Sequence, residues 1–256
     1  MKVLVIGEHC VDKFIYGKIT RLCPEAPVPV LNPVEEKINN GMSGNVVDNL
    51  KALVEDIEII HWHQSNPIEK IRYVEQKSNQ MVVRIDTGEL VPCETLSFLS
   101  PDQKRTISES DIVIISDYNK GYLSPGMINE IASIGSLTLL DSKKKMDFEM
   151  IKNLSFVKLN EIEYSNNRDL VDSNPEKFIV TLGSSGAMYN GVSFPSRDPQ
   201  ETIDVSGAGD TFISSFAVKY FLSGDISSSI DFANDACADV VSRKGVSVPD
   251  KRFKVQ

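Results

Sequence analysis

The sequence predicts an α/β protein built on a mostly parallel sheet that helices cover. Short apolar runs rich in Val and Ile alternate with helical patterns, at residues 3–6, 57–60, 112–115, 137–140, 156–159 and 178–182. Parallel strands are buried on both faces and therefore form such continuous apolar runs. With 256 residues and 41% hydrophobic content, the chain is long enough for one large core. We expect one domain over residues 1–256, with two small domains as the alternative.

Four of the predicted strands end in or run into a polar residue or a glycine. These residues are Asp117, Asp141, Asn160 and Gly183. Ligands of parallel sheets bind beyond the carboxyl ends of the strands. We therefore expect these four residues to converge on one cleft.

Two segments, residues 13–32 and 71–85, break the alternation of strands and helices. Alternating residues in the second segment, such as Ile71, Tyr73, Val82 and Arg84, are typical of half-buried antiparallel strands. We interpret the two segments as a small antiparallel β lid over the cleft. Because exposed strand edges invite pairing, we also predict a homodimer that forms through the lid.

A glycine-rich turn stands directly before an amphipathic helix in the run IDVSGAGDTF, residues 203–212. The apolar residues of this helix recur on one face, at Phe212, Ile213, Phe216, Ala217, Tyr220 and Phe221. Gly207, Ala208 and Gly209 therefore lie at its N-terminus, where unpaired N–H groups and the helix dipole attract anions. This turn predicts a phosphate-binding anion hole.

Asp210 follows the predicted anion hole. A carboxylate there is well placed to take a proton from a hydroxyl that attacks phosphorus. Asp is also a favoured helix cap. The residues alone leave both roles open, catalytic base and helix cap.

A second C-terminal helix is predicted over residues 226–242, ending before Gly245. Ile230, Ala233, Cys237 and Val241 have core spacing. Asn234 on this helix faces either the cleft or the solvent.

Composition favours small-molecule chemistry in a reducing cytoplasm. A net charge of −9 and a pI near 4.9 argue against a nucleic-acid or anionic-membrane partner, and no apolar run has the length of a membrane span. The four cysteines are far apart without a CxxC pair. His61 and His63 share a strand face but lack a nearby Cys or carboxylate, so we interpret them as surface residues rather than metal ligands.

Neither common nucleotide fingerprint, GxxxxGK[ST] or GxGxxG after the first strand, is present. Three other motifs occur in order: Asn160 to Glu163 fits NxxE, VTLGSSGA from Val180 fits VTxGxxG, and DVSGAGD ends at Asp210. With them the chain resembles the ribokinase-like, or PfkB, carbohydrate kinases. TRLCPEAPVPV from Thr20, QMVVRID from Gln80, SDYNKGYL from Ser116 and FANDACADVV from Phe232 are similar to kinase domains that phosphorylate D-glycero-D-manno-heptose 7-phosphate at O1 for ADP-heptose synthesis.

The resemblance implies a three-layer α/β/α fold and ATP and Mg²⁺ as cofactors, with a monovalent cation near Asp204 as a further expectation. Asp210 would activate the sugar hydroxyl, and the amides of residues 207–209 would stabilise the transferring phosphoryl group. Asn160 and Glu163 would arrange Mg²⁺ through its waters, the alternative being that they only start a helix.

The resemblance also assigns the binding residues. Thr181, Gly183, Gly186, Asn234 and Lys143 would bind the nucleotide. Asp12, Gly41, Gly44 and Asn45 would hold sugar hydroxyls, and Arg72, Arg84 and Lys120 would hold the sugar phosphate. Each cation alone could equally be a surface charge, and Asp12 a solvated loop residue.

Three departures from the family pattern affect these expectations. Met42 replaces the second glycine of the family's GG pair, which would reshape the sugar pocket. Between residues 53 and 71 the chain lacks roughly one βα unit that family members carry. The sequence ends at Gln256, so we expect a separate nucleotidyltransferase downstream.

From these observations we predict an ATP-dependent sugar kinase that converts a heptose 7-phosphate, or a related sugar phosphate, to its 1,7-bisphosphate. The alternatives are a PfkB kinase for another sugar and a catalytically weak regulatory protein of the same fold that binds sugar or nucleotide.

Overall fold

An eight-stranded sheet forms the centre of the computed structural model, which describes residues 1–91, 93–196, 203–243 and 245–255. Its strand order is β12-β11-β10-β9-β8-β7-β1-β4. The bounds are β1 Lys2–Gly7, β4 Glu58–Trp62, β7 Ile112–Asp117, β8 Thr138–Ser142, β9 Phe156–Asn160, β10 Phe178–Thr181, β11 Ala187–Tyr189 and β12 Val192–Phe194. All pairings from β4 to β10 are parallel, and only β11 and β12 are added antiparallel. The predicted mostly parallel sheet is confirmed.

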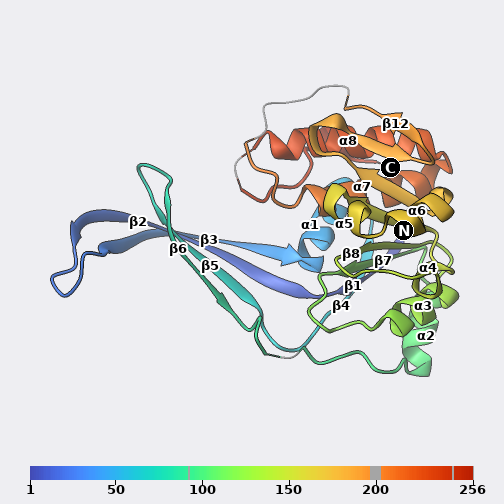
Figure 1. Ribbon diagram of the computed structural model, residues 1–256, viewed down its shortest axis with the longest axis horizontal. Helices are drawn as coiled ribbons and strands as arrows, with labels where there is room; N and C mark the ends of the chain where they lie inside the picture. The colour runs from blue at the N-terminus through green and yellow to red at the C-terminus, as the bar shows by residue number, and fades with distance from the viewer. Residues whose placement is uncertain (92, 197–202, 244, 256) are drawn as a thin grey trace.

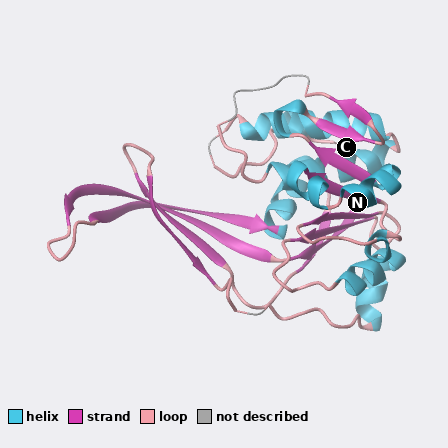
Figure 2. Ribbon diagram, in the orientation of Figure 1, coloured by secondary structure: helices cyan, strands magenta, loops and turns pink. Residues whose placement is uncertain are grey.

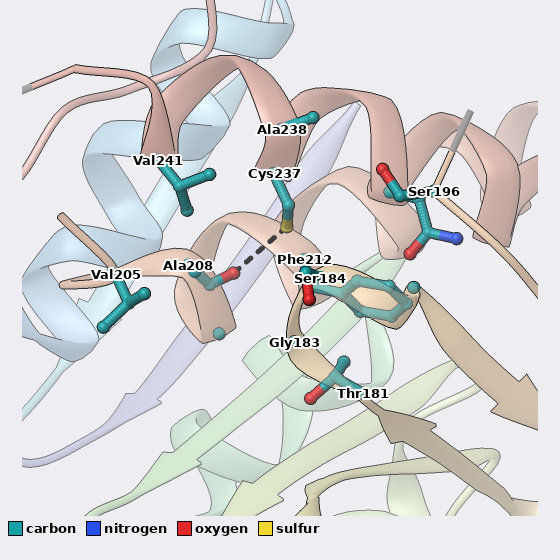
Figure 3. A pocket seen from close by; sticks show the side chains of 13 residues that line it. Thr181, Gly183, Ser184, Ser196, Val205, Ala208, Phe212, Cys237, Ala238 and Val241 are labelled. Atoms are coloured by element: carbon teal, nitrogen blue, oxygen red, sulfur yellow. Dashed lines mark hydrogen bonds between the residues drawn. The ribbon is translucent and has the colours of Figure 1, made fainter. Parts of the chain in front are cut away.

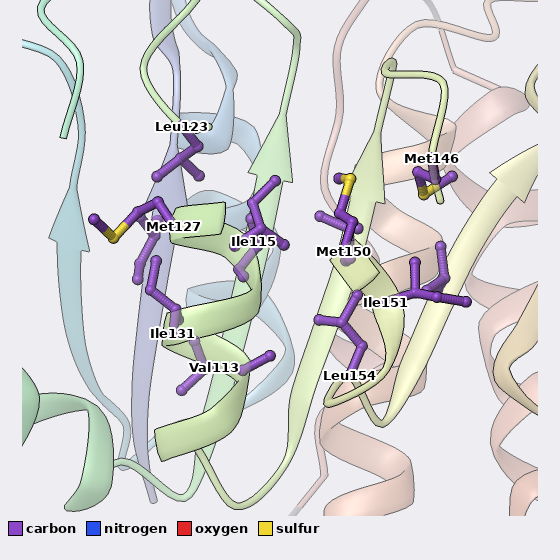
Figure 4. Packing of buried hydrophobic residues seen from close by; sticks show 14 of the residues in the cluster. Val113, Ile115, Leu123, Met127, Ile131, Met146, Met150, Ile151 and Leu154 are labelled. Atoms are coloured by element: carbon purple, nitrogen blue, oxygen red, sulfur yellow. The ribbon is translucent and has the colours of Figure 1, made fainter. Parts of the chain in front are cut away.

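Helices cover both faces of this sheet (Figure 1). On one face lie α2 Pro101–Ser108, α3 Pro125–Ile134, α4 Phe148–Ile151, α5 Glu161–Asn166 and α6 Arg168–Ser173. Figure 4 shows Met127 and Ile131 of α3 packed against Val113 and Ile115 of β7. On the other face lie α1 Ser43–Leu53, α7 Ala208–Ser223 and α8 Ile226–Val241. The three-layer α/β/α arrangement is confirmed, and single 3-10 turns complete it at Pro175–Lys177, Gly183–Ser185 and Lys251–Phe253.

Helix α7 is more deeply buried than an amphipathic surface helix. It begins after Gly207, whose φ of 82° is left-handed, and ends at Gly224, whose N–H bonds to the Tyr220 carbonyl. From Asp210 to Val218 every residue is buried, because α7 packs against α1, α8 and the sheet. Burial on all sides replaces the predicted single apolar face over the first half of the helix.

A second, four-stranded sheet extends from the body as an arm, as Figure 1 and Figure 2 show. Its order is β3-β2-β5-β6, with β2 His9–Leu22, β3 Pro29–Met42, β5 Glu69–Glu75 and β6 Met81–Thr87. The β2–β3 and β5–β6 pairs are antiparallel, as expected for the lid, whereas the central β2–β5 pair is parallel. The strands extend beyond the predicted segments, and we call this sheet the lid sheet.

The connection from α1 to β5, where the chain returns to the lid sheet, contains one element, strand β4. Strand β4 pairs with β1 and forms one edge of the large sheet. The short sequence between residues 53 and 71 thus supplies this one edge strand. Within the described ranges, no helix combines the length and the apolar character needed to cross a membrane.

Gly7 at the end of β1 pairs with Ser116 of β7, and a Cβ at residue 7 would lie 1.9 Å from the Ser116 carbonyl oxygen. We predict that Gly7→Ala lowers the free energy of unfolding by about 1–3 kcal/mol or more, because two backbone segments must move apart. Urea unfolding followed by circular dichroism measures this loss. The matched control is Gly126→Ala in α3, where a Cβ meets only Ser124 Oγ at 4.0 Å and should stabilise by about 0.4–1 kcal/mol. Equal effects of the two variants would contradict the packing argument.

Candidate active site

The N-terminus of α7 lies between two pockets. Ala208 and Gly209 line one pocket, whereas Gly207 and Asp210 line the other. Gly207 is the N-cap residue and has no side chain that could cap the helix, and Asp210 is the third helical residue. The structure therefore does not place Asp210 as the helix cap. Its carboxylate is available to groups outside the helix.

Asp210 is almost fully buried, at 4% exposure. Asn45 Nδ2 donates to Asp210 Oδ2 at 2.8 Å, and the Tyr118 hydroxyl lies 3.1 Å from Oδ1 and 3.4 Å from Oδ2. Burial raises the pKa of Asp210 to about 6, although the hydrogen bond from Asn45 counteracts part of this shift. At neutral pH the carboxylate is ionised, but the ionised form is only slightly more stable than the protonated form. Such a carboxylate is suited to accept a proton.

A buried polar network holds Asn45 toward Asp210. Asn49 Nδ2 donates to the backbone oxygen of Asn45 at 2.7 Å, and the Thr211 hydroxyl donates to Asn49 Oδ1 at 2.8 Å. These bonds join α1 to α7 in the interior, where hydrogen bonds are costly to break. The packing of α1 against α7 therefore sets the distance between Asn45 and Asp210.

The pocket on the Asp210 side has a volume of about 310 Å³ and opens at the base of the lid sheet. Of the predicted sugar residues, Asp12, Gly41 and Asn45 line it, as does Arg72. Arg72 forms an ion pair with Asp12, so the two side chains stabilise one another across β2 and β5. The predicted sugar and phosphate ligands thus meet, in part, in one cavity.

Three predicted substrate residues lie outside the lining of this pocket. Gly44 stands against the His9 ring. Arg84 pairs with Asp86 of its own strand at 2.7 Å, and Lys120 pairs with Glu89 at 3.3 Å. The Asp86 partner is visible in the sequence, two residues after Arg84 on the same strand face, whereas the Glu89 partner of Lys120 depends on the fold.

The same pocket has further lining residues that the sequence did not assign to the substrate. They are Cys10, Phe14, Lys70, Tyr118, Ser206 and Val246, beside Met42 and Asp204, which the sequence had indicated. Lys70 had a usable signal, because it lies two residues before Arg72 on the same face of a strand. The Asp204 carboxylate accepts the N–H groups of Ser206 and Gly245, and a monovalent cation beside it stays a prediction.

The second pocket has a volume of about 170 Å³ and lies between α7, α8 and the turn after β10 (Figure 3). Thr181, Gly183, Gly186 and Asn234 line it, as predicted for the nucleotide residues. Its walls are largely apolar and include Val205, Phe212, Cys237, Ala238 and Val241. An apolar slot with a glycine turn at one end and the α7 amides at the other fits a purine and its phosphates.

Asn234 faces this second pocket rather than the solvent. Its side-chain N–H donates to the Phe194 carbonyl at 2.9 Å, so the amide is already oriented. Cys237 on the next turn donates to the Ala208 carbonyl at 3.3 Å, the bond drawn in Figure 3. Helix α8 is therefore tied to the first turn of α7 beside the pocket.

Asn160 and Glu163 form the start of α5. Asn160 accepts the Glu163 N–H at 2.9 Å, and Glu163 accepts the Asn160 N–H at 2.8 Å, which is a capping box. Lys143 forms an ion pair with Glu163 and does not line the nucleotide pocket. The described residues include no cluster of three His, Cys, Asp or Glu able to hold a metal ion. A nearly buried carboxylate with one amide neighbour fits Mg²⁺, which keeps several waters and few protein ligands.

A buried ion pair lies directly beneath the anion hole. Lys158 Nζ is 2.7 Å from Asp141 Oδ2, and both side chains are nearly inaccessible. Burial lowers the pKa of Lys158, but Asp141 and other nearby carboxylates outweigh burial and raise it. A Cβ at Gly209 would come within 2.7 Å of Lys158 Nζ. The positive charge therefore lies immediately behind the α7 amides.

The four predicted strand-end residues do not converge on one cleft. Gly183 lines the nucleotide pocket, whereas Asp141 is held by Lys158 and Asn160 by Glu163. Asp117 is buried and binds Lys144. Lys158 and Lys144 neutralise the two carboxylates, and strand patterns alone do not predict these pairings.

The histidines form a group that the sequence did not indicate. The rings of His61 and His63 have centroids 4.7 Å apart, and His9 lies 5.1 Å from His63. His63 is exposed, as predicted, but His61 is half-buried. Burial, with the neighbouring His63, lowers the pKa of His61 to about 3. His61 is thus neutral at physiological pH, and its Nε2 lies 2.8 Å from Ser43 Oγ.

Known proteins are similar to this chain along most of its length. Residues 151–252 match the pfkB family carbohydrate kinase. The bifunctional protein HldE of Campylobacter fetus is 29% identical over 293 residues, which cover 96% of this chain and 64% of that protein. HldE of Helicobacter pylori is 30% identical over 298 residues, covering 95% and 63% respectively. The chain therefore spans about three fifths of the length of these relatives.

Solved structures share the fold. Ribokinase of Arabidopsis thaliana, solved with ribose and ATP, has a TM-score of 0.70 and 16% identity, covering 98% of this chain and 96% of that one. Phosphofructokinase-2 of Escherichia coli, solved with potassium, has a TM-score of 0.69 and 15% identity with the same coverage. The predicted ribokinase-like fold and the resemblance to PfkB carbohydrate kinases are confirmed.

The buried charge of Asp210 should cost stability. Its pKa rises from 3.8 to about 6 in the fold, so the folded state loses stability as pH rises from about 4 to about 6. We predict that Asp210→Asn raises the melting temperature at pH 7.5 by several degrees, at about 2–4 °C per kcal/mol. Calorimetry across pH measures the effect, and the difference from wild type should shrink below about pH 6. A variant melting at or below wild type at pH 7.5 would contradict the raised pKa. Asp172→Asn on the exposed surface of α6 is the control.

Proposed function

We propose that the chain is an ATP-dependent carbohydrate kinase in which Asp210 activates the acceptor hydroxyl. The observation that carries this proposal is the position of Asp210 at the first turn of α7, between the two pockets. One pocket has the apolar lining and the glycine turn expected for a nucleotide, and the other carries polar groups suited to a sugar. The similarity to pfkB family carbohydrate kinases over residues 151–252 supports this assignment.

In the proposed reaction the acceptor hydroxyl of the sugar donates a hydrogen bond to Asp210. As the hydroxyl oxygen forms its bond to the γ-phosphorus, its proton passes to the carboxylate. The bond from the γ-phosphorus to the bridging oxygen breaks, and ADP leaves. The N–H groups of Gly207 and Gly209, with the Lys158 charge behind them, stabilise the charge on the transferring group. The Ala208 N–H, also predicted for the anion hole, donates instead to the Val205 carbonyl at 3.2 Å.

Mg²⁺ would neutralise the charge of the ATP phosphates, and we assign its water-mediated binding to Asn160 and Glu163. The support is the nearly buried Glu163 carboxylate next to the Asn160 amide. We retain Lys143, which pairs with Glu163, as a proposed nucleotide-binding residue that would add positive charge near the phosphates. We place the reaction in the cytoplasm, where ATP is available.

The substrate we propose is a sugar that already carries a phosphate. Lys70 and Arg72 line the sugar pocket from one strand face, and cations there would bind a phosphate dianion. The similarity of residues 20–30, 80–86, 116–123 and 232–241 to heptose kinases favours heptose 7-phosphate, phosphorylated at O1. A separate nucleotidyltransferase would act downstream of this product.

Met42 supports one alternative, a regulatory protein that binds sugar or nucleotide with little catalysis. Its φ of 55° is left-handed, an unusual conformation for a residue with a side chain. Its side chain lines the sugar pocket where the family has glycine. Such a protein would bind ligands without releasing ADP.

We predict that Asp210→Asn lowers turnover at least about 100-fold, because the general base is lost, while ATP still binds. The assay is ADP release with Mg²⁺-ATP over a panel of sugars and sugar phosphates that includes heptose 7-phosphates. ATP affinity is measured by calorimetry in the same buffer, and Asp172→Asn serves as the control.

Undiminished turnover in Asp210→Asn would refute the assigned base. Activity on another sugar would retain the kinase and discard the heptose substrate. Ligand binding without ADP release from wild-type protein would favour the regulatory alternative.

The lid sheet supports a homodimer. It projects from the body (Figure 1) and exposes large apolar side chains, namely Leu22, Val28, Val34, Ile38, Met81, Val82, Val83 and Ile85. A second copy of the sheet would bury those of these residues that share one face.

We predict that light scattering gives twice the 28.4 kDa mass of one chain. Ile38→Asp, at 59% exposure on β3, should shift the mass to that of one chain, since burying an unpaired charge is costly. Val192→Asp on the exposed edge strand β12 should leave the dimer intact. A wild-type mass equal to that of one chain at micromolar concentration would refute this interface.

A further inference from the structure

Tyr118 contacts the proposed base but has no role in the reaction described above. Its hydroxyl lies 3.1 Å from Asp210 Oδ1 and 3.4 Å from Oδ2, and its side chain lines the sugar pocket. Asn45 donates to Oδ2, and the closer contact of Tyr118 is with Oδ1. Each oxygen of the carboxylate thus has a different side chain as its nearest donor.

Two buried carboxylates hold the loop that carries Tyr118. Glu8, which is fully buried, accepts the backbone N–H groups of Tyr118, Lys120 and Tyr122 at 2.7 to 3.1 Å. Asp117 accepts the Asn119 N–H at 3.1 Å. Multiple charge-assisted bonds to consecutive residues of a loop restrict its backbone strongly. The position of the Tyr118 hydroxyl is therefore set by the end of β1 and the end of β7.

The phenol can act on Asp210 only as a donor. An ionised carboxylate accepts hydrogen bonds and has none to give, so the Tyr118 proton points to Asp210. Burial, followed by the charge of Asp210, raises the pKa of Tyr118 well above its ordinary value. The hydroxyl keeps its proton at every pH at which the enzyme would work. Its hydrogen bond also lowers the pKa of Asp210, against the effect of burial.

We propose that Tyr118 is a positioning residue whose hydroxyl keeps Asp210 ionised and oriented toward the acceptor hydroxyl. The inference deepens the proposed function and rests on it for the role of Asp210. Each carboxylate oxygen has about two acceptor positions, so one position on Oδ1 stays open for the sugar. Without Tyr118, burial would favour the protonated acid, which cannot accept the proton of the acceptor.

Tyr118→Phe is the direct test because it removes one oxygen and keeps the ring. The ring also carries a contact with Lys143, whose Nζ lies 5.7 Å from its centroid, and phenylalanine retains this contact. The matched control is Tyr122→Phe, the same change in the same loop. The Tyr122 side chain packs in the core beneath α3 instead of contacting Asp210.

The first readout is the titration of Asp210 by carbon NMR in protein labelled at the aspartate carboxyl, with the signal identified by its loss in Asp210→Asn. We expect a midpoint near pH 6 in wild type and a midpoint higher by about one pH unit in Tyr118→Phe. Tyr122→Phe should titrate like wild type. An unchanged midpoint in Tyr118→Phe, or an equal rise in both variants, would overturn the proposal.

The second readout is the pH profile of kcat/KM on the sugar that gives turnover. In Tyr118→Phe the acid limb should move upward with the NMR midpoint, while the rate at high pH recovers to within a few-fold of wild type. A uniform loss at all pH values would indicate a merely structural role and contradict the proposal. Glu8→Gln should shift the limb in the same direction, and combined with Tyr118→Phe it should add little, because both act through one hydroxyl.

The two readouts separate this inference from the proposed function. A shifted NMR midpoint in a protein that phosphorylates none of the sugars refutes the kinase and retains the interaction. Turnover with an unshifted midpoint retains the kinase and refutes the role of Tyr118.

Discussion

The buried carboxylate of Asp210 is the constraint on which the rest of the site depends. A charge removed from water must be compensated by donors and nearby charges, and each neighbouring element supplies one. Asn45 of α1 and Tyr118 of the loop after β7 donate to the carboxylate. Lys158 of β9 contributes positive charge behind Gly209. The compensation is incomplete, which leaves a pKa of about 6 and a carboxylate ready to accept a proton.

The core of the protein keeps these donors in place. Helix α7 is buried from Asp210 to Val218 between the sheet, α1 and α8, so its first turn cannot drift without disturbing the packing. The Asn45–Asn49–Thr211 network fixes α1 against α7. Glu8 fixes the loop of Tyr118 against β1. The geometry of the site is thus a consequence of helix and strand packing rather than of flexible loops.

Sequence patterns predicted the parts of this arrangement that depend on local order. The apolar strand runs, the glycine turn before α7 and the alternating residues of the lid strands are local signals. The structure contains all of these elements. Contacts between residues that are far apart in the sequence gave no such local signal. Lys158 could have been noticed as a lysine inside the apolar run before Asn160, but its pairing with Asp141 depends on the β8–β9 register. Tyr118 lay within a recognised segment, yet its contact with Asp210 joins residues 92 positions apart.

The cations show the same limit. Arg72 and Lys120 were both expected near a sugar phosphate, yet only Arg72 of these two lines the pocket, and Lys120 pairs with Glu89. Lid strands were expected to be antiparallel throughout, but β2 and β5 run parallel. The chain crosses through β3, α1 and β4 between them, and such a crossover connection allows parallel pairing. Such features follow from topology, which short patterns do not specify.

The central claim is that the α7 turn and Asp210 direct the γ-phosphoryl group of ATP onto a sugar hydroxyl. The most direct measurement follows the label from γ-³²P-ATP in the presence of phosphorylated and unphosphorylated sugars, with products separated by chromatography. We expect label in a sugar bisphosphate. Label that appears only in inorganic phosphate, or stays in ATP with every sugar, would contradict it.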